Sequence, residues 1–342
     1  MDASRSPETV FDALAARQLL IVSGKGGVGR TTVAALLGLA LARRGRKVLV
    51  ATVGPDDRLA WMLGLPRLSE TPVVAARGLH VQRVVPQVSI REYGALMLHS
   101  ERIAAAVFDN APMRRLLRTI PGLDDFAILG KVWHEACRAR SFDAIVFDGP
   151  ATGHLRYCLG IPQAILRTLS VGPLPREARL IQDSLEDPAR VQSVLVGLPD
   201  RWPLTELGEM ADSLREELHV GVGAVVVNGL WPAGLPELHA PDPGLDPDGS
   251  ITRVLAATAV VARQARRQRE GVAAWLAETG LSGAASSTSS SSSSSARRPV
   301  GERAAGRDAP VLALPWHWQG FTGLADLEQV LDGIERPDLS AR

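Results

Sequence analysis

The sequence contains few of the residues that mark several large classes of protein. Its two cysteines, Cys137 and Cys158, lie far apart and form no C-x-x-C pair, which argues against a disulfide framework and a cysteine-rich zinc site. No segment supplies the ~20 consecutive apolar residues that a membrane-spanning helix needs. Residues Met1–Gln18 lack the basic-then-apolar pattern of a secretion signal. We therefore expect a protein of a reducing, cytoplasmic compartment.

An excess of charge of either sign is also missing. The 342 residues carry 38 Lys and Arg against 37 Asp and Glu, a net charge of +1. This balance gives no sign of a nucleic-acid partner or of a membrane surface. Four arginines cluster within a long helix predicted over Ile251–Glu278, but no aromatic ladder accompanies them. We interpret them as a solvated helix face and expect no nucleic-acid partner.

Short apolar runs rich in β-branched residues recur along the chain and predict strands. They cover Leu19–Ser23, Lys47–Val53, His80–Val84, Asp143–Asp148, Val222–Asn228 and Val311–Pro315. The hydrophobicity within these runs is continuous rather than alternating, as in strands that are buried on both faces. We therefore predict an α/β fold with a mostly parallel sheet flanked by helices.

Helical spacing and composition divide the rest of the chain. Two blocks, at about 86–140 and 160–218, predict helical insertions into the sheet domain. A Ser/Arg/Gly-rich stretch at 283–308 cannot bury apolar area and predicts a disordered loop. The expected organisation is a single domain over 18–335, preceded by an N-terminal segment at 1–17.

A phosphate-binding loop follows the first predicted strand. The template G-x-x-x-x-G-K-[S/T] is met at Gly24, Gly29 and Thr31, but Arg30 replaces its lysine. Glycines let backbone N–H groups surround phosphate oxygens, and the following helix directs its positive dipole end at them. A turn that merely joins strand to helix is the alternative, although the order of strand, loop and helix favours phosphate. The predicted nucleotide-binding residues are Gly24, Lys25, Gly26, Gly27, Val28, Gly29, Arg30, Thr31 and Thr32.

A second motif, running from Phe142 to His154, ends another predicted strand with Asp148. In P-loop proteins an acid at this place holds the magnesium ion together with the hydroxyl of the loop, here Thr31. A buried aspartate without a partner would be costly, which favours contact with metal or phosphate. Capping of the following helix is the alternative. Thr31 and Asp148 are therefore the candidate metal ligands.

The two motifs, K-G-G-V-G-x-T-T and D-x₃-T-G-H, resemble those of the arsenite-pump ATPase family. That family includes the ATPase that targets tail-anchored membrane proteins, and it belongs to the signal-recognition/MinD-like P-loop class. Within it, the chain is most similar to the bacterial "anion-transporting ATPase" branch of paired, non-identical subunits. The resemblance covers about 18 to 335 and implies a P-loop NTPase fold that binds ATP or ADP with Mg²⁺.

The same resemblance implies roles for individual residues. Lys25, Arg30 and Asp148 would be catalytic, and Asn228, which ends a V-V-V-N strand, would contact adenine. The family's lysine at the position of Lys25 reaches the nucleotide across a dimer interface. The implied partner is a second copy of the chain or a paralogous ATPase, with peripheral contact to a membrane protein as a further expectation.

The chain departs from the family at the first switch, where the family reads S-T-D-P and the aspartate orients the attacking water. This chain reads A-T-V-G-P, so Gly54 stands in place of the carboxylate, and only Asp56 or Asp57 could substitute for it. Because phosphoryl transfer depends on positioning and charge stabilisation, Gly54 and Arg30 together predict slow hydrolysis. Restoring aspartate at position 54 is expected to raise turnover.

Three functions remain open from the sequence. The leading interpretation is an ATP-binding, slowly hydrolysing dimeric switch, and the alternative is a pseudo-ATPase subunit that supports an active paralogue. A metalloid-efflux ATPase subunit is disfavoured, since the family's metalloid site uses three cysteines and this chain has two. The roles of Cys137 and Cys158 are left undecided.

Overall fold

The computed structural model describes residues 7–86, 88–90, 92, 95, 122–232, 250–280 and 309–335. The strands are β1 (Leu19–Gly24), β2 (Val48–Val53), β3 (Val73–Ala76), β4 (Leu79–Val84), β5 (Ala144–Ala151), β6 (Val191–Gly197), β7 (Val222–Leu230) and β8 (Val311–Pro315). The helices are α1 (Pro7–Ala15), α2 (Arg30–Arg43), α3 (Arg58–Met62), α7 (Leu123–Trp133), α8 (Thr152–Thr168), α9 (Pro173–Leu185), α10 (Arg201–Glu216), α11 (Ser250–Thr279) and α12 (Leu324–Glu335). A short π-helical turn, η1 (His134–Arg138), continues α7.

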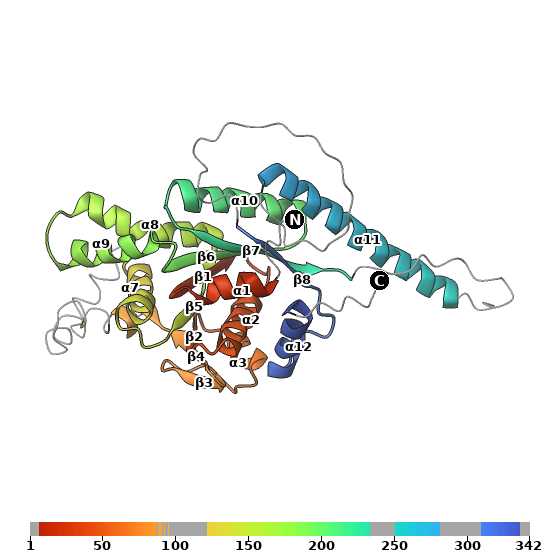
Figure 1. Ribbon diagram of the computed structural model, residues 1–342, viewed down its shortest axis with the longest axis horizontal. Coiled ribbons are helices and arrows are strands. Elements are labelled where there is room, and N and C mark those ends of the chain that lie inside the picture. Colours follow the sequence, from red (N-terminus) through yellow and green to blue (C-terminus); the bar gives the residue numbers. More distant parts are fainter. Residues whose placement is uncertain are drawn as a thin grey trace.

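The eight strands form one sheet in the order β3-β4-β2-β5-β1-β6-β7-β8 (Figure 1). Every neighbouring pair is parallel except β3 and β4, which are antiparallel. The central strand β1 lies between β5 and β6, and the loop that follows it therefore opens at the middle of the sheet's carboxyl edge. The predicted α/β class, a mostly parallel sheet flanked by helices, is confirmed.

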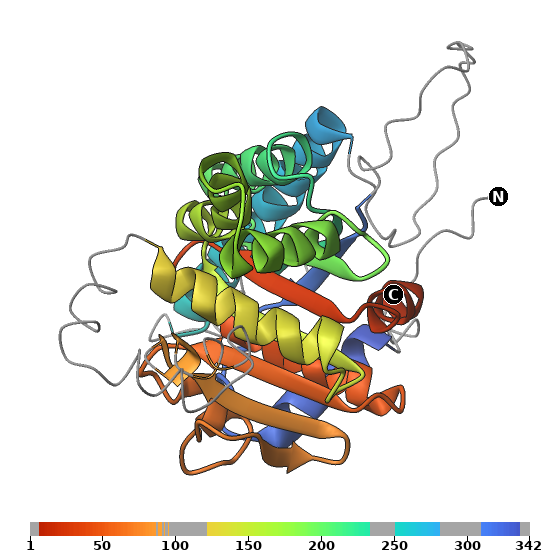
Figure 2. The same ribbon diagram turned by 90° about the vertical axis from the view of Figure 1, so that its left-hand side faces the viewer.

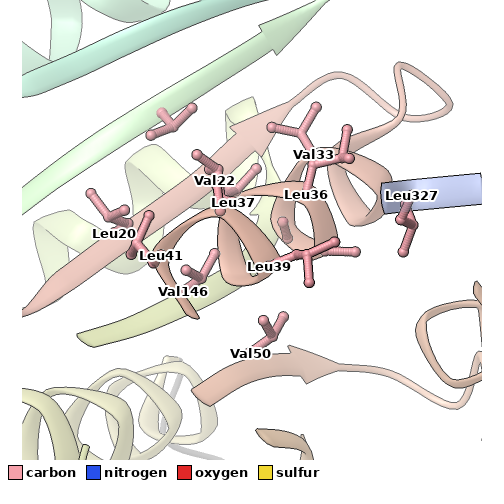
Figure 3. Packing of buried hydrophobic residues seen from close by; sticks show 14 of the residues in the cluster. Leu20, Val22, Val33, Leu36, Leu37, Leu39, Leu41, Val50, Val146 and Leu327 are labelled. Carbon is pink, nitrogen blue, oxygen red and sulfur yellow. The ribbon is translucent and has the colours of Figure 1, made fainter. Parts of the chain in front are cut away.

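Helices cover both faces of the sheet (Figures 1 and 2), because successive side chains of the buried strands point to opposite faces. On one face, Leu20 and Val22 of β1 pack with α1, α2, α3 and α12. On the other, Leu19 and Ile21 pack with α7, α8, α9 and α10. Figure 3 shows the first of these cores around α2, whose run from Val33 to Ala42 is buried throughout. A helix that is apolar on nearly every side suits this position between the sheet and its outer helices.

The helical block predicted at 160–218 is wrong in its middle. Strand β6 lies inside it and pairs with both β1 and β7. Its sequence, V-Q-S-V-L-V-G, lies between helical stretches, and Gln192 and Ser193 interrupt the continuous apolar run that marks the other strands. Strand β3, at the edge of the sheet, was also missed, since its four residues are only partly buried.

The N-terminal boundary also differs from the prediction. Helix α1 was expected to precede the domain, yet its side chains Val10, Phe11 and Leu14 are buried against the core. They lie on one face of the helix through their i, i+1, i+4 spacing, and Arg44 of the α2 C-terminus pairs with Asp12. The domain therefore includes α1.

Two further predictions fall partly or wholly outside the described residues. Of the block at 86–140, α7 and η1 are helical as expected, while most of 87–121 is not described. The Ser/Arg/Gly-rich stretch at 283–308 lies entirely outside the described residues. Among the helices that the structure does describe, not one combines the length and the apolar character that a membrane span requires.

Candidate nucleotide site

The loop between β1 and α2 depends on glycine for its shape. Gly27 and Gly29 have φ of +82° and +92°, in the left-handed region that favours glycine. A Cβ at Gly29 would lie 2.2 Å from Nδ2 of Asn228, and one at Gly24 would lie 2.1 Å from the carbonyl oxygen of Val196. The loop therefore closes directly onto β6 and β7, and its last glycine leads into the first turn of α2, where unpaired N–H groups suit an anion.

A buried carboxylate faces the first turn of α2. Asp148, on β5, is 7% exposed, and its Oδ2 accepts hydrogen bonds from Oγ1 of Thr31 at 2.8 Å and from Oγ1 of Thr52 at 3.1 Å. Burial raises the pKa of the Asp148 carboxyl above its ordinary value, whereas the two hydroxyls and the charge of Arg30 act in the opposite direction. The structure thus brings Thr31 and Asp148 together as one oxygen-rich group, which is the donor set that Mg²⁺ prefers.

Arg30 connects the loop to the segment that follows Asp148. Its Nη1 donates a hydrogen bond of 2.6 Å to the carbonyl oxygen of Gly149. Near this contact, Oγ of Ser23 donates to the carbonyl oxygen of Pro150 at 2.7 Å. The side chains of Ser23 and Arg30 are therefore hydrogen-bonded to the backbone immediately after Asp148. A movement of one segment would displace the other.

The side chain of Lys25 extends toward α10 rather than toward Asp148. Its Nζ contacts Oε1 of Glu206 at 2.5 Å, and both side chains are partly exposed. The lysine is therefore paired within its own chain in this structure, at a surface rather than inside the loop. Glu206 lies 181 residues away in sequence, and for this reason no local pattern marked it.

Asn228 contacts the loop itself. Its Nδ2 donates a hydrogen bond of 2.8 Å to the carbonyl oxygen of Val28. The next residue, Gly229, has φ of +79°, and the ring of Trp316 lies 3.1 Å from where its Cβ would be. Exposed indole rings of Trp316 and Trp318 continue this surface, with centroids 6.1 Å apart. Asn228 thus links the phosphate loop to an aromatic surface at the ends of β7 and β8.

The end of β2 lacks a carboxylate, as the sequence indicates, and its backbone has an unusual conformation. Gly54 has φ of +118°, a conformation that other residues rarely adopt. Asp57 accepts hydrogen bonds from the backbone N–H of Leu68 and from Arg83, so its carboxylate is engaged away from the site. Asp56 instead lines the cavity beside Asp148. Of the two candidate substitutes for the missing aspartate, Asp56 is the one that lines the cavity, and it accepts a hydrogen bond from the backbone N–H of Arg58.

A cavity of about 320 Å³ joins these groups. Its lining includes the polar residues Arg30, Thr31, Thr52 and Asp148, and α7 and α8 contribute both apolar and polar side chains. Thr52 and Asp125 were not singled out from the sequence. Thr52 could have been found, since it lies in the first-switch sequence two residues before Gly54, whereas Asp125 is brought in only by the packing of α7. Thr32, predicted to bind nucleotide, directs its hydroxyl to the sulfur of Met62 at 3.6 Å.

Comparisons with known proteins indicate which family this chain resembles. Residues 17–172 match the model of a family described as anion-transporting ATPases. The ATPase BagA of Mycobacterium tuberculosis is 30% identical over 228 residues, which cover 64% of this chain and 66% of that protein, just under two thirds of its length. An ATPase get3 of Aspergillus terreus is 29% identical over 204 residues, covering 58% of this chain and 57% of the relative.

A third relative extends the range of the family. A Halobacterium salinarum protein whose name describes an arsenical pump-driving ATPase is 25% identical over 229 residues, covering 62% of this chain and 35% of the relative. These matches confirm the family resemblance and, with it, the expectation of a P-loop ATPase fold.

Proposed function

We propose that this chain, whose residues 17–172 match the model of the anion-transporting ATPase family, binds ATP or ADP with Mg²⁺ and acts as a slow, nucleotide-dependent dimeric switch. The observation that carries the proposal is the convergence of Thr31 and Asp148 beside the glycine loop. These oxygens would hold the ion and its water shell, and the ion would neutralise charge on the phosphates. The backbone N–H groups of the loop and of the α2 N-terminus would bind the phosphate oxygens.

Binding and hydrolysis make different demands on this site. Binding needs the loop, Thr31 and Asp148, whereas hydrolysis also needs a group that orients water toward the γ-phosphorus as the bond to ADP breaks. Gly54 offers no side chain for that task, and Asp56, which lines the cavity, is largely exposed. These features support nucleotide binding with slow turnover.

Arg30 supports the same division. The Arg30 guanidinium is hydrogen-bonded to the carbonyl oxygen of Gly149, so its position depends on the segment after Asp148 rather than on the loop alone. Nucleotide phosphates would compete for this cation and release Gly149 from it. We infer that this exchange starts the conformational change that α7 and α8 transmit, since α8 begins directly after β5.

Lys25 supports a dimer joined across the nucleotide. A cation at this exposed position can reach outward once its contact with Glu206 breaks, and an exposed pair of this kind contributes only about 0.2–1 kcal/mol. The partner would be a second copy or a paralogous ATPase, in a cytoplasmic setting and in peripheral contact with a membrane protein. Asn228 and the neighbouring Trp316 would face the adenine.

The second candidate is a pseudo-ATPase that binds nucleotide and supplies Lys25 to an active paralogue. Gly54 and Arg30 favour it, because both changes weaken hydrolysis while leaving the binding groups in place. Calorimetry with ATP and Mg²⁺, followed by phosphate release with and without the paralogue, tests the two together. Absence of nucleotide binding at millimolar concentration would refute both, and turnover that appears only with the paralogue would favour the second.

A further inference from the structure

One cluster of side chains in the cavity wall has no part in the proposed nucleotide chemistry. Asp125 of α7 meets His154 and Cys158 of α8, and one ligand atom from each lies within 4.8 Å of the others. Nε2 of His154 is 2.9 Å from Oδ1 of Asp125. The three line the same cavity as Thr31 and Asp148.

We propose that Asp125, His154 and Cys158 form a binding site for a borderline transition-metal ion such as Zn²⁺, separate from the magnesium position. The proposal does not depend on nucleotide binding. It rests on the identity of the three donors, on their spacing and on the open side that they turn toward the cavity.

The placement of the donors follows from the two helices. His154 and Cys158 are four residues apart in the first turns of α8, so they lie on one face of that helix. Asp125 lies in the first turn of α7, which packs against α8. Two elements thus fix the three donors, and the third donor is 29 residues from His154 in sequence.

The distances suit a tetrahedral ion after a small adjustment. Bonds of about 2.0–2.3 Å to nitrogen, oxygen and sulfur place neighbouring ligand atoms about 3.5 Å apart. The atoms here lie between hydrogen-bonding distance and 4.8 Å of one another, so side-chain movements of roughly 1 Å bring them into position. Three protein ligands leave a fourth position, which opens into the cavity.

The donor chemistry selects the class of metal. Imidazole and thiolate favour Zn²⁺ and its neighbours, whereas Mg²⁺ and Ca²⁺ take oxygen ligands almost alone. The cluster therefore differs in kind from the oxygen group of Thr31 and Asp148. Cys158 is 8% exposed, while His154 reaches solvent and provides the entry path.

Metal binding is coupled to proton release. Burial, reinforced by the nearby Asp125 carboxylate, raises the pKa of the Cys158 thiol, so the thiol is protonated without metal. On binding, the metal–sulfur bond replaces the S–H bond and one proton leaves to solvent. Binding through Nε2 of His154 requires that this nitrogen carry no proton, so its hydrogen bond with Asp125 is given up and the ring proton lies on Nδ1. Affinity is therefore expected to rise with pH.

The experiment uses Co²⁺ as the probe, titrated into the untagged full chain with excess Mg²⁺ and no nucleotide. We expect one Co²⁺ per chain, with visible bands of tetrahedral cobalt, a thiolate-to-cobalt charge-transfer band, and displacement by Zn²⁺. Cys158→Ser abolishes the charge-transfer band, and Asp125→Asn and His154→Ala each weaken binding at least about tenfold. Cys137→Ser, which removes the other buried thiol, leaves the spectrum unchanged.

Circular dichroism checks that each variant is folded, and Asp125→Asn decides the matter if Cys158→Ser does not fold. Absence of a cobalt spectrum would overturn the proposal, and so would a charge-transfer band that survives Cys158→Ser or affinity unchanged by Asp125→Asn. Since no nucleotide is present, these results are independent of whether the chain binds ATP.

Discussion

Strands β2 and β5 lie side by side in the sheet, and their carboxyl ends differ in what they offer the site. Strand β5 carries Asp148, buried and held by two hydroxyl groups. Strand β2 ends before Gly54, which has neither a side chain nor a backbone conformation that another residue adopts easily. Under the proposed function, the first arrangement would serve binding of a metal–nucleotide complex, while the second would lack a group that orients water. The difference would then separate nucleotide binding from hydrolysis within one site.

The largest expected effect comes from the end of β5. Asp148→Asn and Thr31→Ala should each weaken Mg²⁺-dependent nucleotide affinity by roughly 10–100-fold, because each removes an oxygen that holds the ion or its water shell. Affinity measured with EDTA should change much less. Thr258→Ala is a suitable control, since that hydroxyl bonds only to its own helix, at Val254. Calorimetry in both conditions makes the comparison, and equal losses with and without magnesium would argue against a metal role.

The end of β2 can be tested by restoring the missing carboxylate. Gly54→Asp should raise turnover by up to about 100-fold, the lower end of the range for a positioned acid or base, if the rest of the site is competent. The φ of +118° opposes this gain, since a strained residue costs of order 1–3 kcal/mol. Gly54→Ala carries the same strain without the carboxylate and is the matched control. Phosphate release that rises equally in both variants would show that the carboxylate is irrelevant.

Substitution of Lys25 tests whether a second subunit contributes to the site and so compensates for the group that is missing at the end of β2. Lys25→Ala should reduce the fraction of dimer formed with a non-hydrolysable ATP analogue, as measured by light scattering. Glu206→Gln frees Lys25 from its partner and should leave that fraction unchanged or slightly raised. A wild-type monomer under every nucleotide condition, with the paralogue also present, would contradict the dimer.

The smallest effect concerns stability in the absence of metal. Because burial raises the pKa of Asp148 in the folded protein, the folded state holds its proton more tightly than the unfolded state. The stability contribution of this group therefore falls as pH rises from about 3.8, its ordinary value, through the raised folded pKa. Asp148→Asn should unfold at a higher temperature than wild type at neutral pH with EDTA, and the gap should narrow in acid. A gap that widens in acid would contradict this sign.

The local features of the site could be predicted from the sequence. The glycine loop, Asp148 and Asn228 all belong to continuous segments in which a strand meets a loop, and the structure brings them together. Strand β6 was missed because Gln192 and Ser193 interrupt its apolar run between two helical stretches. The pairing of Lys25 with Glu206 and the meeting of Asp125 with Cys158 depend on packing between helices, which no short pattern records. The positive φ of Gly54 likewise could not be predicted from the sequence.

The most direct test of the central claim measures binding and turnover on one preparation of the purified chain. Calorimetry gives the affinity for ATP with Mg²⁺, and phosphate release under saturating ATP gives the turnover number. The account predicts clear magnesium-dependent binding together with turnover well below about 1 s⁻¹, the lower end of the ordinary range for enzymes. Turnover within that range, unaffected by Asp56→Ala, would contradict it.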